Sequence, residues 1–266
     1  MHSMQLNGRL VNFEAGQTLL EVARANEVPI PTLCHHPGLE SHGGCRLCVV
    51  EVTRAEWDGW WRMVSACEFP AADDLIVATE SERLSRTRRN VVDLLLARCP
   101  ETPFTVALGR DFGLAKSSLA PRAEPDDCIL CGLCVRVCAA VGAHAIAGAD
   151  RGVHKQVGPP YAPPSFERPP GLAPAGDCIG CLCCAEICPT GHIRYENNAQ
   201  GREIWGRSFR VVECASCGAP LGTPEQLDHF AAKSGLSRDY FERCDACSKL
   251  DTARAFDQQV MGEGTS

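Results

Sequence analysis

Two cysteine runs in the middle of the chain constrain it more than any other feature. The first reads CILCGLCVRVC and the second CIGCLCCAEICP, and both contain the spacing C-x2-C-x2-C-x3-C. This spacing wraps thiolates around a cube of four irons and four sulfides, and the fourth cysteine of each run ligates the cluster of the other run. The pattern therefore predicts two [4Fe-4S] clusters with crossed ligands. The first is assigned to Cys128, Cys131, Cys134 and Cys188, and the second to Cys178, Cys181, Cys184 and Cys138.

The cysteine count and the charge limit the class of protein. Most of the 18 cysteines fall in metal-ligand spacings, which leaves few for a disulfide scaffold. The sequence has no secretory leader pattern and no run that approaches the roughly 18 apolar residues of a transmembrane segment. The net charge of -7 argues against a nucleic-acid binder. We therefore expect a cytoplasmic protein, with docking at the periphery of a membrane complex as an alternative.

Four cysteines in residues 1–79 predict a third cluster. Asn7-Gly8 indicates a hairpin turn, Thr18 is placed to cap a helix, and strands are expected at 49–52 and 62–65. The cysteines follow the pattern C-x10-C-x2-C-x18-C, which suits a two-iron cluster held mainly by a loop. They are Cys34, Cys45, Cys48 and Cys67. The segment TRAEWDGWW between the strands is compatible with a solvated loop or with a partner surface.

Residues 80–125 are predicted to form a helical connector. Thr79 to Glu82 fits a capping box, and the helix is expected to end near Arg98. Its apolar stripe consists of Leu84, Val91, Leu94 and Leu95. Cys99 is the one thiol of the connector, and we expect it to pack as a small hydrophobic residue.

The double-cluster domain is predicted to span residues 126–198, with a proline- and glycine-rich insertion at 148–176. The insertion indicates a surface excursion that either shields the clusters or docks a partner subunit. Cys183 has no place in the cluster spacing and is interpreted as a spare thiol. His144 and His192 lie just beyond the two runs, where they are compatible with surface histidines or with donors that raise a cluster potential.

Two C-x2-C knuckles predict a four-thiolate module at residues 199–255, after a strand expected at 205–212. Its ligands are Cys214, Cys217, Cys244 and Cys247. A structural zinc ion in a zinc-ribbon-like module is the main prediction, and a third [4Fe-4S] cluster or a single iron would use the same ligands. Residues 256–266 are expected to be a frayed tail.

Three segments carry a resemblance to a known family: HHPGLESHGGCRLCVVEV, the region around Cys67, and TESERLSRTRRNVVDLLL. They resemble the N-terminal part of the large iron-sulfur subunit of respiratory complex I. They are similar also to the diaphorase subunit of bidirectional [NiFe] hydrogenases and to NAD-linked formate dehydrogenases. The resemblance implies a β-grasp fold for residues 1–79, with a [2Fe-2S] cluster on the four cysteines.

The connector departs from that family. In the family, this helix runs into an H-x3-C-x2-C-x5-C segment that binds a histidine-ligated [4Fe-4S] cluster. The present chain has LLLARCPETPFTVALGRDFG in that place, with one cysteine and no histidine. The histidine-ligated cluster is therefore predicted to be absent.

The sequence has no P-loop, dinucleotide glycine fingerprint, nucleophile elbow or flavin site. We therefore expect an α+β electron-transfer subunit that relays single electrons and is not itself catalytic. By the resemblance, its partners are a flavin- and NAD(H)-binding subunit and a catalytic subunit of the hydrogenase or molybdenum or tungsten oxidoreductase type. A redox-sensing regulatory protein is the main alternative. A stand-alone enzyme needs an iron with an open ligand position, and both runs are complete.

Overall fold

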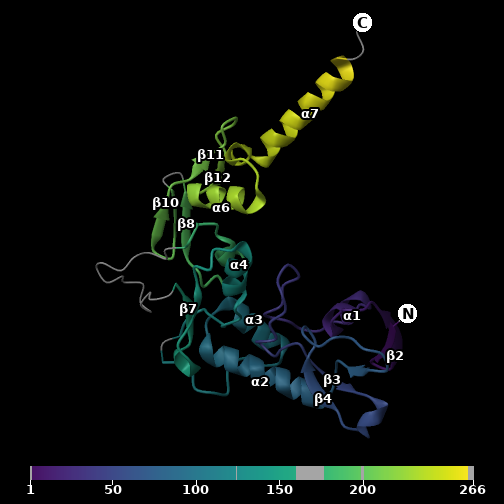
Figure 1. The fold of residues 1–266 in the computed structure, drawn as a ribbon. Coiled ribbons are helices and arrows are strands. Elements are labelled where there is room, and N and C mark those ends of the chain that lie inside the picture. Colours follow the sequence, from purple (N-terminus) through teal and green to yellow (C-terminus); the bar gives the residue numbers. More distant parts are fainter. Residues whose placement is uncertain (1, 124, 160–176, 199–200, 263–266) are drawn as a thin grey trace.

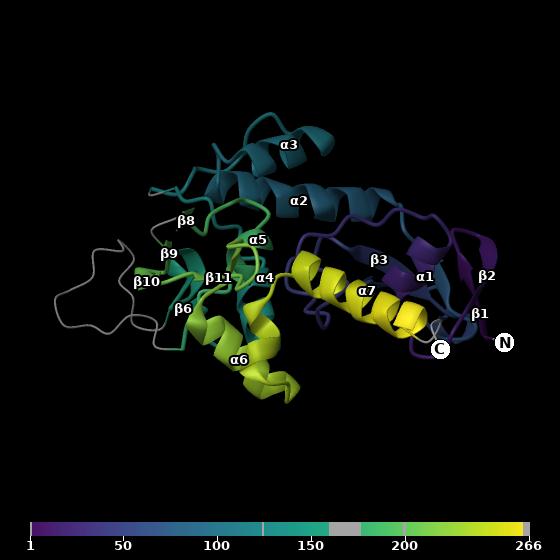
Figure 2. The ribbon, with the colours of Figure 1, turned by 90° about the horizontal axis from the view of Figure 1, so that it is seen from above.

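The computed structural model describes residues 2–123, 125–159, 177–198 and 201–262, with the backbone alone for residues 258–262. A sheet domain at the N-terminus, a cluster domain around α4 (Leu133–Val141) and a C-terminal module with α6 (Pro224–Ser234) and α7 (Asp245–Gly262) follow one another along the chain (Figure 1). Helix α2 (Glu82–Arg98) runs beside the first two of these units in both views (Figures 1 and 2). Of the expected insertion, residues 160–176 lie outside the described residues.

The N-terminal domain is a five-stranded sheet with one helix. Its strand order is β2-β1-β5-β3-β4; β1 and β5 are parallel, and the other pairs are antiparallel. The elements are β1 (His2–Leu6), β2 (Arg9–Phe13), α1 (Leu19–Ala25), β3 (Val49–Thr53), β4 (Arg62–Ser65) and β5 (Ile76–Ala78). The expected hairpin is confirmed, because Asn7 and Gly8 take left-handed φ values of 51° and 79° at its turn. Thr18 caps α1, as predicted, and the structure shows that it does so in a capping box with Glu21.

The tryptophan-rich segment connects β3 to β4 and contains a short 3-10 helix, η1 (Ala55–Trp57). Trp57 packs against the core of the sheet domain, whereas Trp60 is 61% exposed. The segment therefore partly buries one of its aromatic rings and presents another to solvent.

Two helices form the connector, α2 (Glu82–Arg98) and α3 (Pro103–Asp111). The predicted cap at Thr79 is wrong: Ser81 accepts the hydrogen bond from the Leu84 N–H, while the Thr79 N–H donates to the side chain of Asn7. Leu94 is 60% exposed, so its assignment to the buried stripe is also wrong. The stripe on α2 that is buried runs through Leu84, Arg88, Val92 and Leu96.

The cluster domain has short elements around a core that includes cysteines of both runs. Its elements are α4 (Leu133–Val141), β6 (Ala147–Ala149), η2 (Gly152–His154), β7 (Gln156–Gly158), α5 (Cys183–Glu186), β8 (Tyr195–Asn198), β9 (Gly201–Ile204) and β10 (Arg207–Phe209). The single strand expected from residue 205 is wrong. Trp205 and Gly206 have φ values of 55° and 66° and form the turn between β9 and β10.

The C-terminal module consists of β11 (Val212–Glu213), β12 (Pro220–Gly222), α6 (Pro224–Ser234), η3 (Arg238–Glu242) and α7 (Asp245–Gly262). Helix α6 packs on the cluster domain: the Lys233 ammonium donates to the carbonyls of Ala140 and Val141 at the C-terminal end of α4. Helix α7 projects away from the rest of the chain (Figure 1). It continues to Gly262, so the frayed tail expected from residue 256 is wrong up to that residue. Among the helices described, none is long and apolar enough to span a membrane.

Candidate iron-sulfur and metal sites

The four cysteines of the N-terminal domain form two close thiol pairs. The Sγ atoms of Cys48 and Cys67 lie 3.4 Å apart, and Cys34 shares a hydrogen bond with Cys45. Each hydrogen bond favours one thiolate: it lowers the pKa of Cys45 to about 5 and that of Cys48 to about 7. A [2Fe-2S] cluster takes two thiolates on each iron. The two close thiol pairs therefore fit a [2Fe-2S] cluster, with one pair on each iron.

The loop between Cys34 and Cys45 brings the backbone close to the sulfurs. The backbone N–H groups of Gly43 and Gly44 are directed at Cys67 and Cys34. Gly43 has a φ of +56°, and a Cβ atom there would lie 1.7 Å from the Glu68 carboxylate. No other residue fits this position without displacing Glu68. The loop can therefore supply N–H donors to a bound cluster.

Cysteines from both runs line one small cavity. Those that line it are Cys128, Cys131, Cys134 and Cys188. Burial raises the pKa of Cys128 to about 11 and that of Cys134 to about 12. The thiolates of Cys128 and Cys134 thus depend on a cationic group such as iron to offset their desolvation. His192 also lines the cavity, and burial lowers its pKa.

The remaining cysteines of the two runs line a second small cavity. Cys138, Cys178, Cys181 and Cys184 line it, together with Cys183. The Trp205 indole N–H donates to the Cys184 sulfur at 3.5 Å, and the Ala145 N–H donates to the Cys138 sulfur at 3.2 Å. Cys183, which the spacing leaves out, therefore lies in this cavity as a fifth thiol.

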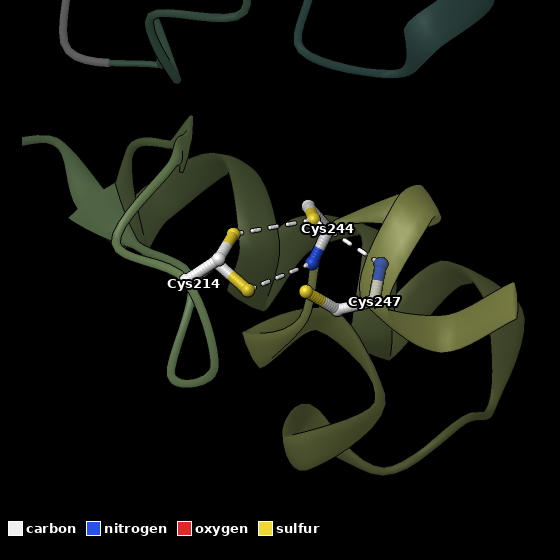
Figure 3. Close-up of side chains that lie close together, drawn as sticks. Cys214, Cys244 and Cys247 are labelled. Atoms are coloured by element: carbon white, nitrogen blue, oxygen red, sulfur yellow. Dashed lines mark hydrogen bonds between the residues drawn. The ribbon is translucent and has the colours of Figure 1, made fainter. Parts of the chain in front are cut away.

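The four C-terminal cysteines form the most compact group. Their sulfur atoms all lie within 4.8 Å of one another, and no other group of three or more such donors does so among the described residues. Cys214, Cys244 and Cys247 turn their thiols toward one another (Figure 3). The Cys244 N–H donates to the Cys214 sulfur at 3.3 Å and lowers the pKa of Cys214 to about 6. This group can hold one thiophilic ion.

Three residues outside these sets have distinct positions. Cys99 is fully buried and lines neither cavity, and its burial raises its pKa to about 12. His144 is exposed, with a φ of 49° beyond the end of α4. Trp205 was not singled out from the sequence, because no spacing marks a donor that tertiary packing brings to a sulfur.

Comparison with known proteins places these sites in a family. Residues 2–82 match the model of the 2Fe-2S iron-sulfur cluster binding domain. The chain is 29% identical over 299 residues to the NADP-reducing hydrogenase subunit HndD of Solidesulfovibrio fructosivorans; the alignment covers 100% of this chain and 49% of that protein. It is 28% identical over 244 residues to a subunit of the NADH-quinone oxidoreductase of Rhizobium meliloti (strain 1021), and that alignment covers 82% of this chain and 27% of that protein.

A solved structure is similar over most of its length. It is the NAD+-reducing [NiFe]-hydrogenase in the H2-reduced state, with 31% sequence identity and a TM-score of 0.59 over 72% of this chain and 86% of that chain. By contrast, the chain spans about half of the NADP-reducing hydrogenase protein and about a quarter of the quinone oxidoreductase protein. The chain therefore belongs to the family of iron-sulfur subunits that NADH-quinone oxidoreductases share with hydrogenases that reduce NAD+ or NADP+.

Proposed function

We propose that the chain is an electron-transfer subunit of a multisubunit oxidoreductase, with one [2Fe-2S] and two [4Fe-4S] clusters. One observation carries this proposal: cysteines from both runs line each of two cavities. The [2Fe-2S] cluster would be held by Cys34, Cys45, Cys48 and Cys67. The four-iron clusters would be held by Cys128, Cys131, Cys134 and Cys188, and by Cys178, Cys181, Cys184 and Cys138. The sheet order of the first domain supports a β-grasp fold at residues 1–79.

The clusters would supply one-electron steps, and the chain would position and shield them. All twelve of these cysteines are buried or half-buried, which limits solvent access to the clusters. The resemblance places a histidine-ligated cluster at the connector, but Cys99 there is buried and α3 follows it. Electrons would therefore pass between the [2Fe-2S] cluster and the first run without that centre.

We propose zinc for the C-terminal site. Four thiolates at about 2.3 Å around one tetrahedral ion lie roughly 3.8 Å from one another. The Cys217 and Cys244 sulfurs are 3.7 Å apart, in agreement with one shared ion. Thiolates that bind four different irons of a cube lie farther apart, so this spacing favours a single ion over a third [4Fe-4S] cluster. A single iron would satisfy the same geometry.

The names of the relatives suggest the partners. Two of them are hydrogenases that reduce NAD+ or NADP+, and another belongs to an NADH-quinone oxidoreductase. We propose that a flavin- and NAD(H)-binding subunit exchanges electrons with the chain on one side, and a catalytic metalloenzyme subunit does so on the other.

Metal analysis and EPR on anaerobically purified protein test the proposal. We expect about ten irons and one zinc per chain, with one two-iron and two four-iron signals. About fourteen irons without zinc would instead assign a cluster to the C-terminal cysteines. Freeze-quench EPR after partial reduction tests the relay: a [2Fe-2S] cluster that exchanges no electrons with the four-iron clusters contradicts it. A redox sensor, in contrast, would change its affinity for a partner subunit with its oxidation state.

A further inference from the structure

One contact recurs at all three cysteine sets of the proposed relay. In each set, the backbone carbonyl of the first cysteine accepts a hydrogen bond from an arginine that lies outside that set. The three pairs are Arg136 with Cys34, Arg98 with Cys128, and Arg207 with Cys178. Guanidinium groups suit this role because they carry several donors in a rigid plane and stay charged. Each set therefore has a cation against its first ligand.

Arg136 differs from the other two because it joins two sites. It lies on α4, between Cys134 and Cys138 of the first run, and its guanidinium reaches the loop of the N-terminal set. There it donates to the Cys34 carbonyl and, at 2.6 Å, to the Glu40 carbonyl. Its Nε atom is inaccessible to solvent and has no hydrogen-bond partner. The side chain is thus half-buried, and its guanidinium bridges from α4 to the loop of the N-terminal set.

A second contact lies beside the first. His42, in the same loop, faces the turn of the first run: a Cβ atom added to Gly132 would lie 3.7 Å from its Nε2 atom. The loop that carries Cys34 and Cys45 therefore meets the first run at two points, the turn before α4 and the side of α4.

In the described part of the chain, the positive charge of Arg136, unlike the charges of Arg98 and Arg207, is not balanced by an ion pair with a carboxylate. Arg98 forms an ion pair with Asp126 at 3.2 Å, and Arg207 forms one with Glu225 at 3.5 Å. Among the residues that the structure describes, no carboxylate forms an ion pair with Arg136. A cation whose charge is not neutralised by a neighbouring carboxylate acts more strongly on a nearby redox centre.

We propose that Arg136 is a positioning residue that holds the [2Fe-2S] loop against the first four-iron run and raises the potential of the [2Fe-2S] cluster. This inference rests on the proposed relay. Reduction adds negative charge to a cluster, so a nearby cation stabilises the reduced form. The same side chain fixes the separation of the two clusters through its two carbonyl contacts.

Redox titration of the full reconstituted chain, followed by EPR, tests the inference. Arg136→Met removes both the charge and the donors, and Arg136→Lys keeps the charge without the planar fork. At a fixed potential, Arg136→Met should lower the ratio of reduced to oxidised [2Fe-2S] about tenfold, which corresponds to about 59 mV for one electron. Arg136→Lys should restore most of that ratio. Both variants should weaken the magnetic interaction between the reduced [2Fe-2S] cluster and its four-iron neighbour.

Arg207→Met is the matched control, because it removes the equivalent contact at Cys178. It should leave the [2Fe-2S] ratio unchanged. The inference is overturned if Arg136→Met leaves that ratio at the wild-type value, or if Arg207→Met shifts it equally. If Arg136→Met takes up no [2Fe-2S] cluster, Arg136→Lys decides: an undiminished magnetic interaction excludes the positioning role.

Wild-type protein without a [2Fe-2S] signal would refute the proposed relay, whereas unaltered variants with all signals present would refute the role of Arg136 alone.

Discussion

The indole nitrogen of Trp205 lies 3.5 Å from the sulfur of Cys184, and its N–H group donates to that sulfur. Trp205 stands at the turn between β9 and β10, and its ring lines the second cavity. Hydrogen bonds to ligand sulfur stabilise the reduced state of a cluster and so raise its potential. Through this contact, Trp205 can tune the potential of the second proposed four-iron cluster.

Trp205→Phe should therefore lower the potential of the second four-iron cluster. A net hydrogen bond of about 0.5–1.5 kcal/mol corresponds to a roughly twofold to tenfold lower ratio of reduced to oxidised cluster at fixed potential. EPR-monitored titration measures the ratio. The control is Trp61→Phe, which changes a tryptophan of the sheet domain that is 36% exposed. An unchanged ratio in Trp205→Phe would show that the indole does not tune this cluster.

Gly43→Ala should reduce [2Fe-2S] content while the four-iron signals persist. The left-handed φ costs an alanine about 1–2 kcal/mol, and its Cβ would also force the exposed Glu68 side chain away from the loop. Gly16→Ala separates these effects, because Gly16 has a φ of +91° and nothing lies within 4 Å of its added Cβ. Iron analysis and EPR compare the two variants. Equal [2Fe-2S] occupancy in both would contradict the close approach at Gly43.

Cys99 should be unreactive in the folded protein. The thiolate is the reactive form of cysteine, and burial raises the pKa of Cys99 from 9.0 to about 12. At pH 8 its thiolate fraction is then about 10⁻⁴. The neutral thiol contributes stability that is present below pH 9 and is lost as the pH rises toward 12. Mass spectrometry after iodoacetamide treatment should find Cys99 unmodified until the protein is unfolded. Cys99→Ala should keep the full iron content; a loss of four irons would make Cys99 a ligand.

Arg88 should stabilise the packing of α2 on the N-terminal sheet. Its guanidinium is buried and donates to the carbonyls of Val49 at 2.7 Å and Thr79 at 3.0 Å. Arg88→Met keeps an apolar side chain but leaves these acceptors without their donor, which should lower the free energy of unfolding by about 1–3 kcal/mol. Thermal unfolding measures the change. The exposed Arg86 on the same helix provides the control, and equal losses in Arg86→Met and Arg88→Met would contradict the assignment.

Local sequence signals predicted the elements that depend on neighbours along the chain. Asn7-Gly8 forms its hairpin turn and Thr18 caps its helix, because both rely on contacts within a few residues. The sequence around Thr79 fits a capping box as well as that around Thr18. In the structure, however, the Thr79 N–H donates to the Asn7 side chain, and the Asn7 amide donates to the Thr79 hydroxyl. The cap moves to Ser81. A local pattern could not report that competition, because it depends on how β1 and β5 pair.

The sites divide in the same way. Spacing within each run is a covalent property, and it determined which cysteines can surround a cluster. How the two runs pack decides which cysteines meet. One cavity brings together Cys138 and Cys178, and the other brings together Cys188 and Cys128. The sequence by itself therefore determined the candidate ligands. The tertiary structure decided what surrounds them, from Trp205 at Cys184 to Arg136 at Cys34, because those donors come from segments whose positions only packing defines.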